Sequence, residues 1–260
     1  MNILITGAAG GIARKVIDKI KSREDHIWVT VHTDAQLERA KKKYENNSHI
    51  QCMKLDITNS KDREKLKKMD IDVLLCNAAI GEGGSLAEMD MERVRHNFEV
   101  NVFSNFTCVQ IVLKNMIKKG RGRIVLMSSL AGIVPVPFLG SYCATKASII
   151  KIFETLRLEL TLIPEEIDVI CIEPGLYATG FNKVMFENKY PEMEKGSYFA
   201  PELAIIRARE TFLLKLFERK KLDGIACKIE KAIYQRKPKK VYKDPYIQAL
   251  FAKFYFLFFE

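Results

Sequence analysis

A tyrosine and a lysine four residues apart, Tyr142 and Lys146, are the side chains of this sequence best suited to act together. On a helix, this spacing puts both side chains on one face. A lysine ammonium beside a phenol stabilises the phenolate, so the phenol pKa is expected to fall from about 10 towards neutrality. Such a phenol can exchange a proton with an alcohol or a carbonyl group. The same spacing is common on solvated helix faces, so the interpretation needs support from the rest of the chain.

A glycine-rich turn follows the first apolar run, in the sequence Thr6-Gly7-Ala8-Ala9-Gly10-Gly11-Ile12-Ala13. Glycines between a strand and a helix let backbone N–H groups approach a pyrophosphate at the helix N-terminus. The position of the turn, directly after the first strand of an alternating chain, predicts dinucleotide binding. Ala13 replaces the third glycine of the usual pattern and still permits close packing of helix on strand.

The elements that must position these residues alternate along the chain. Short apolar runs rich in Val, Ile and Leu predict strands buried on both faces, and longer amphipathic segments between them predict helices. The predicted strands are 2–6, 27–32, 50–55, 73–76, 123–127 and 169–172, and the predicted helices are 12–23, 35–46, 61–69, 91–119 and 142–162. This alternation predicts an α/β fold, a doubly wound Rossmann-like parallel sheet with helices on both faces.

We expect one dinucleotide-binding and catalytic domain over residues 1–245, with a mobile loop or helical lid near 180–200. A basic helix follows Pro201, and an aromatic tail occupies residues 246–260. The tail is expected to pack on the domain or a partner subunit, to lie on a membrane surface, or to be disordered. Aromatic and methionine side chains in the lid favour a hydrophobic substrate or, equally, ordinary lid packing.

Composition narrows the class of protein. The 260 residues are 48% hydrophobic and 28% charged, and no apolar run reaches the roughly 20 residues of a membrane span. The sequence starts without a charged-then-apolar leader, and its six cysteines include no C-x-x-C pair. We therefore expect a cytoplasmic protein, peripheral to a membrane if the tail binds one, with reduced cysteines and no metal site.

The positive charge of the chain is concentrated at its C-terminal end. The net charge is +10, and residues 201–260 hold 14 Lys and Arg against 7 Asp and Glu. This end is compatible with an anionic partner or with ordinary solvated helices. We do not expect nucleic-acid binding, because the positive charge is the only feature of the sequence that would support it.

Seven motifs in order resemble those of the short-chain dehydrogenase/reductase family over about residues 1–180. They are Thr6-Gly7-x3-Gly11-Ile12, Asp56-Ile57, Asn77-Ala78-Ala79, Asn101, Ser128-Ser129-Leu130-Ala131-Gly132, Tyr142-x3-Lys146 and Pro174-Gly175-x3-Thr179. Cys76 and Ile80 depart from the family pattern around the third motif, where an asparagine and a glycine are usual. We expect both to be tolerated, because Asn77 remains.

The resemblance implies a catalytic set of Asn101, Ser129, Tyr142 and Lys146. Tyr142 would exchange a proton with the substrate, and Ser129 would hold the substrate oxygen. Lys146 would bind the nicotinamide ribose and lower the pKa of Tyr142. Asn101 would hold a water that links Lys146 to solvent, although a satisfied core amide is the alternative.

The resemblance also implies a set of coenzyme contacts. Asp56 would bind the adenine amino group, the Ile57 N–H the adenine ring, and Asn77 would close the adenosine pocket. The Tyr177 backbone and Thr179 would hold the carboxamide. The full implied set is Gly7, Gly11, Ile12, His32, Thr33, Asp56, Ile57, Asn77, Ala78, Tyr142, Lys146, Pro174, Gly175, Tyr177 and Thr179.

The end of the second strand bears on the choice between NAD and NADP. Enzymes that use NAD place an acid there to bind the ribose 2′-hydroxyl. Here His32 takes that place, and Thr33 stands where many NADP enzymes have arginine. The missing acid and the nearby Arg14 favour NADP, whereas Asp34 would favour NAD if the turn is longer.

The resemblance therefore implies an oxidoreductase that moves a hydride between NADP or NAD and a hydrophobic alcohol or ketone, lipid-, steroid- or acyl-like. A non-catalytic NAD(P)-binding regulator or scaffold on the same fold is the alternative. We also expect a homodimer or homotetramer, formed through the long helices 91–119 and 142–162.

Overall fold

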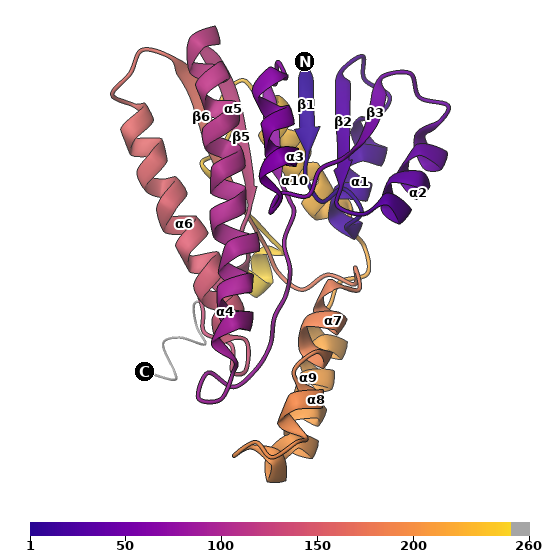
Figure 1. Cartoon of the computed structure of the whole chain (residues 1–260), viewed down its shortest axis with the longest axis vertical. Coiled ribbons are helices and arrows are strands. Elements are labelled where there is room, and N and C mark those ends of the chain that lie inside the picture. The colour runs from indigo at the N-terminus through magenta and orange to yellow at the C-terminus, as the bar shows by residue number, and fades with distance from the viewer. Residues whose placement is uncertain (251–260) are drawn as a thin grey trace.

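The computed structural model describes residues 1–250 and contains one seven-stranded sheet of parallel strands (Figure 1). From residue 251 on, the predicted aromatic tail lies outside the described residues. The strand order is β3-β2-β1-β4-β5-β6-β7. The strands are β1 (Asn2–Ile5), β2 (His26–Val31), β3 (Ile50–Lys54), β4 (Val73–Cys76), β5 (Arg121–Met127), β6 (Glu166–Pro174) and β7 (Val241–Asp244).

The six predicted strands and the doubly wound α/β fold are confirmed. The prediction missed β7, which pairs with β6 at the edge of the sheet. Its sequence Val241-Tyr242-Lys243-Asp244 is short and half charged, so it lacks the apolar run that marks the other strands. A strand of this kind is defined by its neighbour more than by its own composition.

Helices cover both faces of the sheet. They are α1 (Gly11–Ile20), α2 (Asp34–Tyr44), α3 (Ser60–Glu64), α4 (Met91–Phe98), α5 (Asn105–Lys119), α6 (Gly140–Leu160), α7 (Phe181–Glu187), α8 (Tyr190–Met193), α9 (Leu203–Phe217) and α10 (Asp223–Tyr234). The predicted helix 91–119 is divided, because Glu99–Ser104 forms a π-helical segment between α4 and α5. The basic region after Pro201 holds two helices, α9 and α10, where the sequence predicted one.

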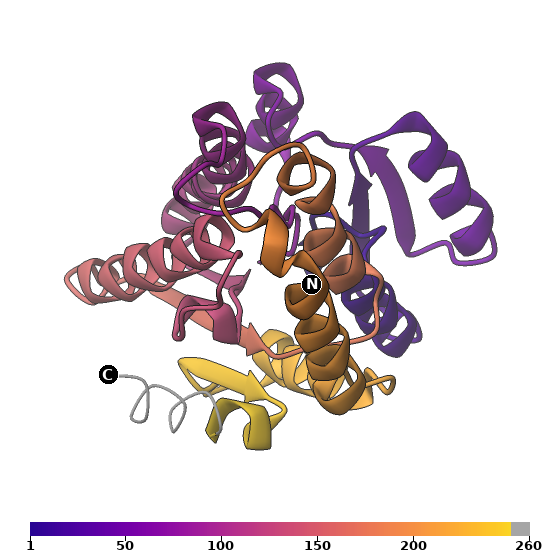
Figure 2. The ribbon, with the colours of Figure 1, turned by 90° about the horizontal axis from the view of Figure 1, so that it is seen from below.

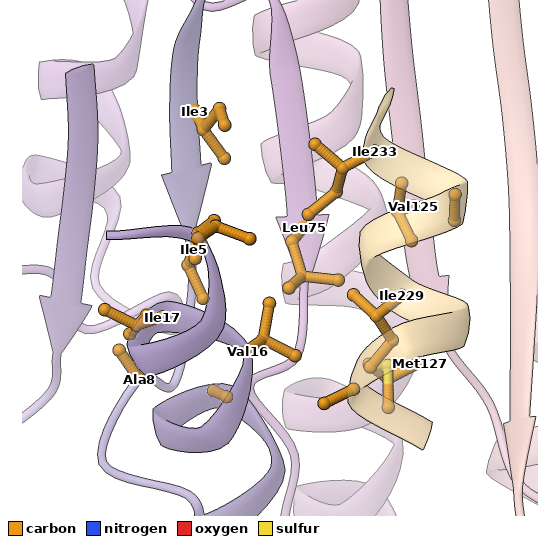
Figure 3. Packing of buried hydrophobic residues seen from close by; sticks show 14 of the residues in the cluster. Ile3, Ile5, Ala8, Val16, Ile17, Leu75, Val125, Met127, Ile229 and Ile233 are labelled. Carbon is orange, nitrogen blue, oxygen red and sulfur yellow. The ribbon is translucent and has the colours of Figure 1, made fainter. Parts of the chain in front are cut away.

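The alternation of side chains along each strand produces two apolar layers. Ile3 and Ile5 of β1 point into a core with α1 and α10, as Figure 3 shows, whereas Leu4 points into the opposite core. Val125 and Ile124 of β5 divide in the same way. Both faces are therefore buried, which explains the nearly continuous apolar runs in the sequence.

The helices α7, α8 and α9 form a lid that extends from the carboxyl ends of the strands (Figure 1). Figure 2 looks onto this edge and shows the lid across its middle. The lid is helical and continues beyond the expected range 180–200 to the end of α9. It begins and ends at one place, because Arg219 N–H donates to the Leu176 carbonyl at 3.0 Å and Ala178 N–H donates to the Arg219 carbonyl at 2.9 Å.

The strand order reverses between β1 and β4, because β2 and β3 lie on one side of β1 and β4 to β7 on the other. Ligands of such sheets bind in the crevice beyond the carboxyl ends of the strands at this point. The glycine turn after β1 and the Asn77 segment after β4 both lie there. Within residues 1–250, no helix has the length and apolar character needed to cross a bilayer.

Gly7→Ala tests the turn after β1. Gly7 has φ 60°, and a Cβ there would lie 2.6 Å from the Ala78 Cα, so we expect the free energy of unfolding to fall by about 2–4 kcal/mol in urea titrations. The control is Gly120→Ala, where φ is 80° but a Cβ meets no described atom within 4 Å. It should cost about 1 kcal/mol. Equal losses for the two variants would contradict the close approach of Gly7 to Ala78.

Candidate active site

The glycine turn is fastened to the end of β4 by the Thr6 hydroxyl and the Asn77 amide. Thr6 Oγ1 accepts hydrogen bonds from the backbone N–H groups of Asn77, at 3.0 Å, and Ala78, at 3.1 Å. Asn77 Nδ2 donates to the carbonyls of Thr6, at 3.2 Å, and Gly7, at 2.9 Å. The amide that was expected to close an adenosine pocket therefore also fixes the turn that would hold the pyrophosphate.

The N-terminus of α1 fits a phosphate group. Gly10 is its N-cap, no side chain caps the helix, and the first turn has no acidic residue, so the first N–H groups and the helix dipole face the turn. A Cβ on Gly11 would lie 2.8 Å from Thr179 Cγ2, so the turn and the loop after β6 are in contact. The predicted residues Gly7, Gly11 and Thr179 thus come together, with Ile12 in the first turn of α1.

The residues after β2 and β3 lie further along the same edge. Asp56 Oδ1 accepts from the N–H and the hydroxyl of Thr58, at 2.9 and 2.7 Å, which forms an Asx turn. Ile57 is buried. Thr33 is the N-cap of α2 and accepts from Gln36 N–H at 3.2 Å, whereas Asp34 is the first residue of that helix.

The end of β2 carries little negative charge towards the crevice. His32 and Thr33 are exposed. Asp34, the alternative ribose ligand, forms an ion pair with Lys54 at 2.6 Å. Because that lysine neutralises the carboxylate, the local charge does not oppose a phosphate on the ribose.

Lys146 is buried between α6 and β5. Its side chain is only 3% exposed, and its Nζ donates a hydrogen bond to the Met127 carbonyl at 3.0 Å. Its own carbonyl accepts from Ser128 Oγ at 3.0 Å, which ties the helix to the end of the strand. Burial lowers the pKa of Lys146 to about 8, because the interior disfavours the ammonium.

The pKa of Tyr142 differs from the expectation. Burial raises the pKa of this phenol well above its usual value, and a hydrogen bond with Ser129 offsets part of the rise. Lys146 Nζ lies 5.6 Å from the centre of the Tyr142 ring and donates its hydrogen bond to the Met127 carbonyl. The lowering of the pKa by Lys146 that the spacing predicted is therefore wrong for the protein chain itself.

Ser129 lies next to Tyr142. It follows β5, in extended conformation, and its Oγ also accepts from Ala131 N–H at 3.1 Å. Apolar lid side chains surround the tyrosine: Met185 and Phe186 belong to its cluster, and its ring centre lies 5.9 Å from that of Phe181. Tyr142 thus faces an apolar wall supplied by the lid.

Asn101 is fully buried in the π-helical segment and is held on several sides. Its Oδ1 accepts from Ile80 N–H at 2.9 Å, and its Nδ2 donates to the Ile80 carbonyl at 2.9 Å. Nδ2 also contacts Asn97 Oδ1 at 2.8 Å and Thr145 Oγ1 at 3.2 Å. The side chain therefore joins the loop after β4 to α6, between Tyr142 and Lys146.

Two further asparagines continue this arrangement and were missed from the sequence. Asn97 Nδ2 donates to Ser141 Oγ at 2.9 Å, and Asn105 Nδ2 donates to the carbonyl of Ala78 at 3.0 Å. All three asparagines are buried and spaced by four residues. A polar stripe of this period on the buried side of an apolar helix was the signal that could have revealed them.

The loop after β6 is braced from the C-terminal part of the chain. Gly175 N–H donates to the Asp244 carbonyl at 2.7 Å, and the Tyr177 hydroxyl hydrogen-bonds the Asp244 carboxylate. Gln248 Oε1 accepts from Leu176 N–H at 2.9 Å, while its Nε2 donates to the Phe217 carbonyl at 2.6 Å. The predicted residues Pro174, Gly175, Tyr177 and Thr179 thus stand at the same edge, with Asp244 and Gln248 as unpredicted supports.

Comparison with known proteins agrees with this geometry. The sequence profile described as short chain dehydrogenase matches residues 1–190. A 3-ketodihydrosphingosine reductase from Bacteroides thetaiotaomicron is 30% identical, over 96% of this chain and 90% of that protein. An NADPH-dependent 3-dehydrocapnine reductase from Ornithobacterium rhinotracheale is 26% identical, over 92% and 86%. A solved structure, the closed form of serine dehydrogenase complexed with NADP+, shares the fold with a TM-score of 0.76 and 20% identity, over 94% of both chains.

Lys146→Met tests the cost of the buried ammonium. The pKa falls from 10.5 to about 8 on folding, so at pH 7, where the amine is protonated in both states, burial opposes folding by about 3 kcal/mol. The substitution also removes the hydrogen bond from Lys146 Nζ to the Met127 carbonyl, which is worth about 1 kcal/mol. We expect the variant to unfold with a free energy about 2 kcal/mol higher at pH 7 in urea titrations.

The difference should shrink as the pH rises from 8 towards 10.5, because folded wild type then sheds the proton that the unfolded chain retains. The control is Lys151→Met, an exposed lysine on the same helix that pairs with Glu154 at 2.9 Å. It should show no such pH dependence. A Lys146→Met variant that is less stable than wild type at pH 7 would contradict this account.

Proposed function

The chain belongs to the short chain dehydrogenase family, and on that premise we propose that it is an NADP(H)-dependent oxidoreductase that interconverts a ketone and an alcohol of a hydrophobic substrate. One observation carries the proposal. Tyr142, which lies beside Ser129 and is followed by a buried Lys146, stands at the strand edge that also holds the open glycine turn. An acid–base group and a phosphate cradle at one crevice suit hydride transfer from a dinucleotide.

Each residue has a role in this mechanism. Tyr142 gives its phenolic proton to the carbonyl oxygen, and Ser129 donates a hydrogen bond to that oxygen as negative charge develops there. Lys146 holds the ribose hydroxyls beside Tyr142, and Asn101 fixes α6 and the loop after β4 in register. When bound, the nicotinamide supplies or accepts the hydride. The Asn101 water relay remains part of the proposal.

The protonation states favour reduction. Burial keeps the phenol of Tyr142 protonated at neutral pH, which suits a group that must donate a proton to a carbonyl. Lys146, with a pKa of about 8, is mostly ammonium at pH 7. A non-catalytic regulator would need neither the buried Lys146 nor the buried Tyr142, so we favour an enzyme over a regulator.

The substrate is proposed from the walls of the site. Met185, Phe186 and Phe181 of the lid contact or adjoin Tyr142, so the carbonyl would be approached through an apolar environment. The two relatives named above are reductases of 3-ketodihydrosphingosine and of 3-dehydrocapnine. We therefore propose a lipid-like ketone as the substrate class.

We further propose that the chain assembles as a homodimer or homotetramer through α5 and α6. Phe103 beside α5 and Leu158 on α6 are exposed by 55% and 66%, so apolar surface is available on these two long helices. Burial of such side chains favours association.

Tyr142→Phe tests the acid–base role. The variant should retain coenzyme affinity within about twofold but lose turnover by at least about a thousandfold, because the proton donor is removed and the ring remains. Affinity is measured by fluorescence of bound NADPH, and turnover by its oxidation with a panel of long-chain ketones. The control is Tyr234→Phe. Tyr234 lies on α10, where its hydroxyl donates to the Asp25 carboxylate at 2.6 Å, and its loss should leave turnover unaltered. Wild-type turnover in Tyr142→Phe would refute the mechanism.

His32→Asp tests the choice of coenzyme. An acid at the end of β2 binds the ribose 2′-hydroxyl and repels a 2′-phosphate, so kcat/KM for NADPH should fall by about tenfold or more and that for NADH should rise. The control is His32→Asn, which has the same shape without the charge. An unchanged ratio of the two kcat/KM values in His32→Asp would contradict the alignment of His32 with the acid of NAD enzymes.

A further inference from the structure

Helix α9 of the lid is apolar on two sides. Its inner side packs against α7 and α8 and is fixed by Glu210, which forms an ion pair with the fully buried Lys189 at 2.8 Å. Its outer side carries Ile205, Phe212 and Leu216, exposed by 49%, 62% and 60%. A contiguous apolar stripe on the outer side of a helix normally marks a surface that a partner covers. The outer side of α9 therefore needs a partner that the described chain does not supply.

The outer residues form one continuous stripe. Ile205, Phe212 and Leu216 are separated by seven and four residues, which places them in one line along a helix, and Arg209 falls between the first two. Leu213 is also exposed and widens the stripe by one position. Because Glu210 and Lys189 hold the opposite side of the helix, this stripe is fixed in its outward orientation.

The charges around the stripe have one sign. Between residues 203 and 222, Arg209, Lys215, Arg219, Lys220 and Lys221 are exposed. Arg207 is also exposed, but it pairs with Glu194 and stacks on Tyr190 at the inner side of the helix. The two acidic residues of the same stretch point inwards: Glu210 is buried, and Glu218 accepts from Asn182 Nδ2 at 2.9 Å. The outer surface of α9 and the turn after it is therefore apolar and cationic.

A second apolar group adjoins the end of α9. Tyr246, Ile247 and Leu250 are exposed by 71%, 58% and 44%, and Gln248 between them hydrogen-bonds the Phe217 carbonyl at 2.6 Å. Figure 2 shows this C-terminal segment beside the end of α9. The sequence continues as Phe-Ala-Lys-Phe-Tyr-Phe-Leu-Phe-Phe-Glu, which contains almost no charge.

We propose that α9 and residues 246–250 dock this protein on the surface of an anionic phospholipid bilayer. An amphipathic helix with aromatic and aliphatic residues on one side and flanking lysines and arginines binds such surfaces in their plane. A second copy of the chain fits less well, because a twofold contact would place the cationic surface against itself. The docking surface stands on its own geometry and does not depend on the proposed reaction.

The test is sedimentation of the full chain with vesicles. Wild type should pellet with vesicles of phosphatidylcholine and phosphatidylglycerol, and about tenfold less with phosphatidylcholine alone. Phe212→Ser/Leu216→Ser should reduce binding to the anionic vesicles by about tenfold or more, as should Lys220→Glu/Lys221→Glu. The control is Leu162→Ser, an 85% exposed leucine before the amino end of β6, at the opposite edge of the sheet, which should change binding by less than about twofold.

Three results would overturn the proposal. The first is wild type that does not pellet with anionic vesicles. The second is a Phe212→Ser/Leu216→Ser variant that pellets like wild type. The third is a Leu162→Ser variant that loses as much vesicle binding as Phe212→Ser/Leu216→Ser. A smaller particle for Phe212→Ser/Leu216→Ser in light scattering without vesicles would instead assign the stripe to a second copy. Coenzyme binding without vesicles should be unchanged in all variants, which separates misfolding from lost docking. Vesicle binding without ketone reduction would refute the proposed function and leave the docking surface intact.

Discussion

The site depends on a single charge kept away from water. Lys146 lies between α6 and β5, and its ammonium donates to the carbonyl of Met127 at the end of that strand. Its desolvation costs folding energy, so the protein tolerates it only because strand, helix and the Ser128 hydroxyl fix its place. The same confinement sets how it can act, since an amine turned towards a backbone carbonyl does not by itself acidify the neighbouring phenol.

The parallel sheet explains why so much of the site was visible in the sequence. The motifs of Gly7, Asn77, Ser129 and Thr179 follow β1, β4, β5 and β6, and all of these strands end at one edge, so the four residues had to converge once the alternation was recognised. Tyr142 and Lys146 needed only the period of one helix. Local spacing combined with a simple topology was therefore sufficient to predict which residues lie together at the candidate site.

Other features depended on tertiary packing. The direction of the Tyr142 pKa follows from how deeply α6 and the lid bury the phenol, which no spacing reveals. The π-helical segment at Glu99–Ser104 arises where Asn101 must reach both Ile80 and Thr145. Likewise, β7 exists because β6 offers an edge to a short polar segment. These features follow from contacts between distant parts of the chain, and the sequence marks them only weakly.

The polypeptide enters and leaves the lid at one place, where Leu176 and Ala178 exchange hydrogen bonds with Arg219. The segment between them leaves the sheet after β6 and returns to it before α10. The lid also contacts the segment after β4, because Asn188 bonds the carbonyl of Gly81 and the N–H of Gly83. The part of this insertion beyond Thr179 supplies Phe181, Met185 and Phe186 beside Tyr142, so a change in its length or chemistry changes that wall and leaves the strand ends in place. On the proposed mechanism, evolution can thus vary the apolar wall beside Tyr142 and retain the residues at the ends of the strands.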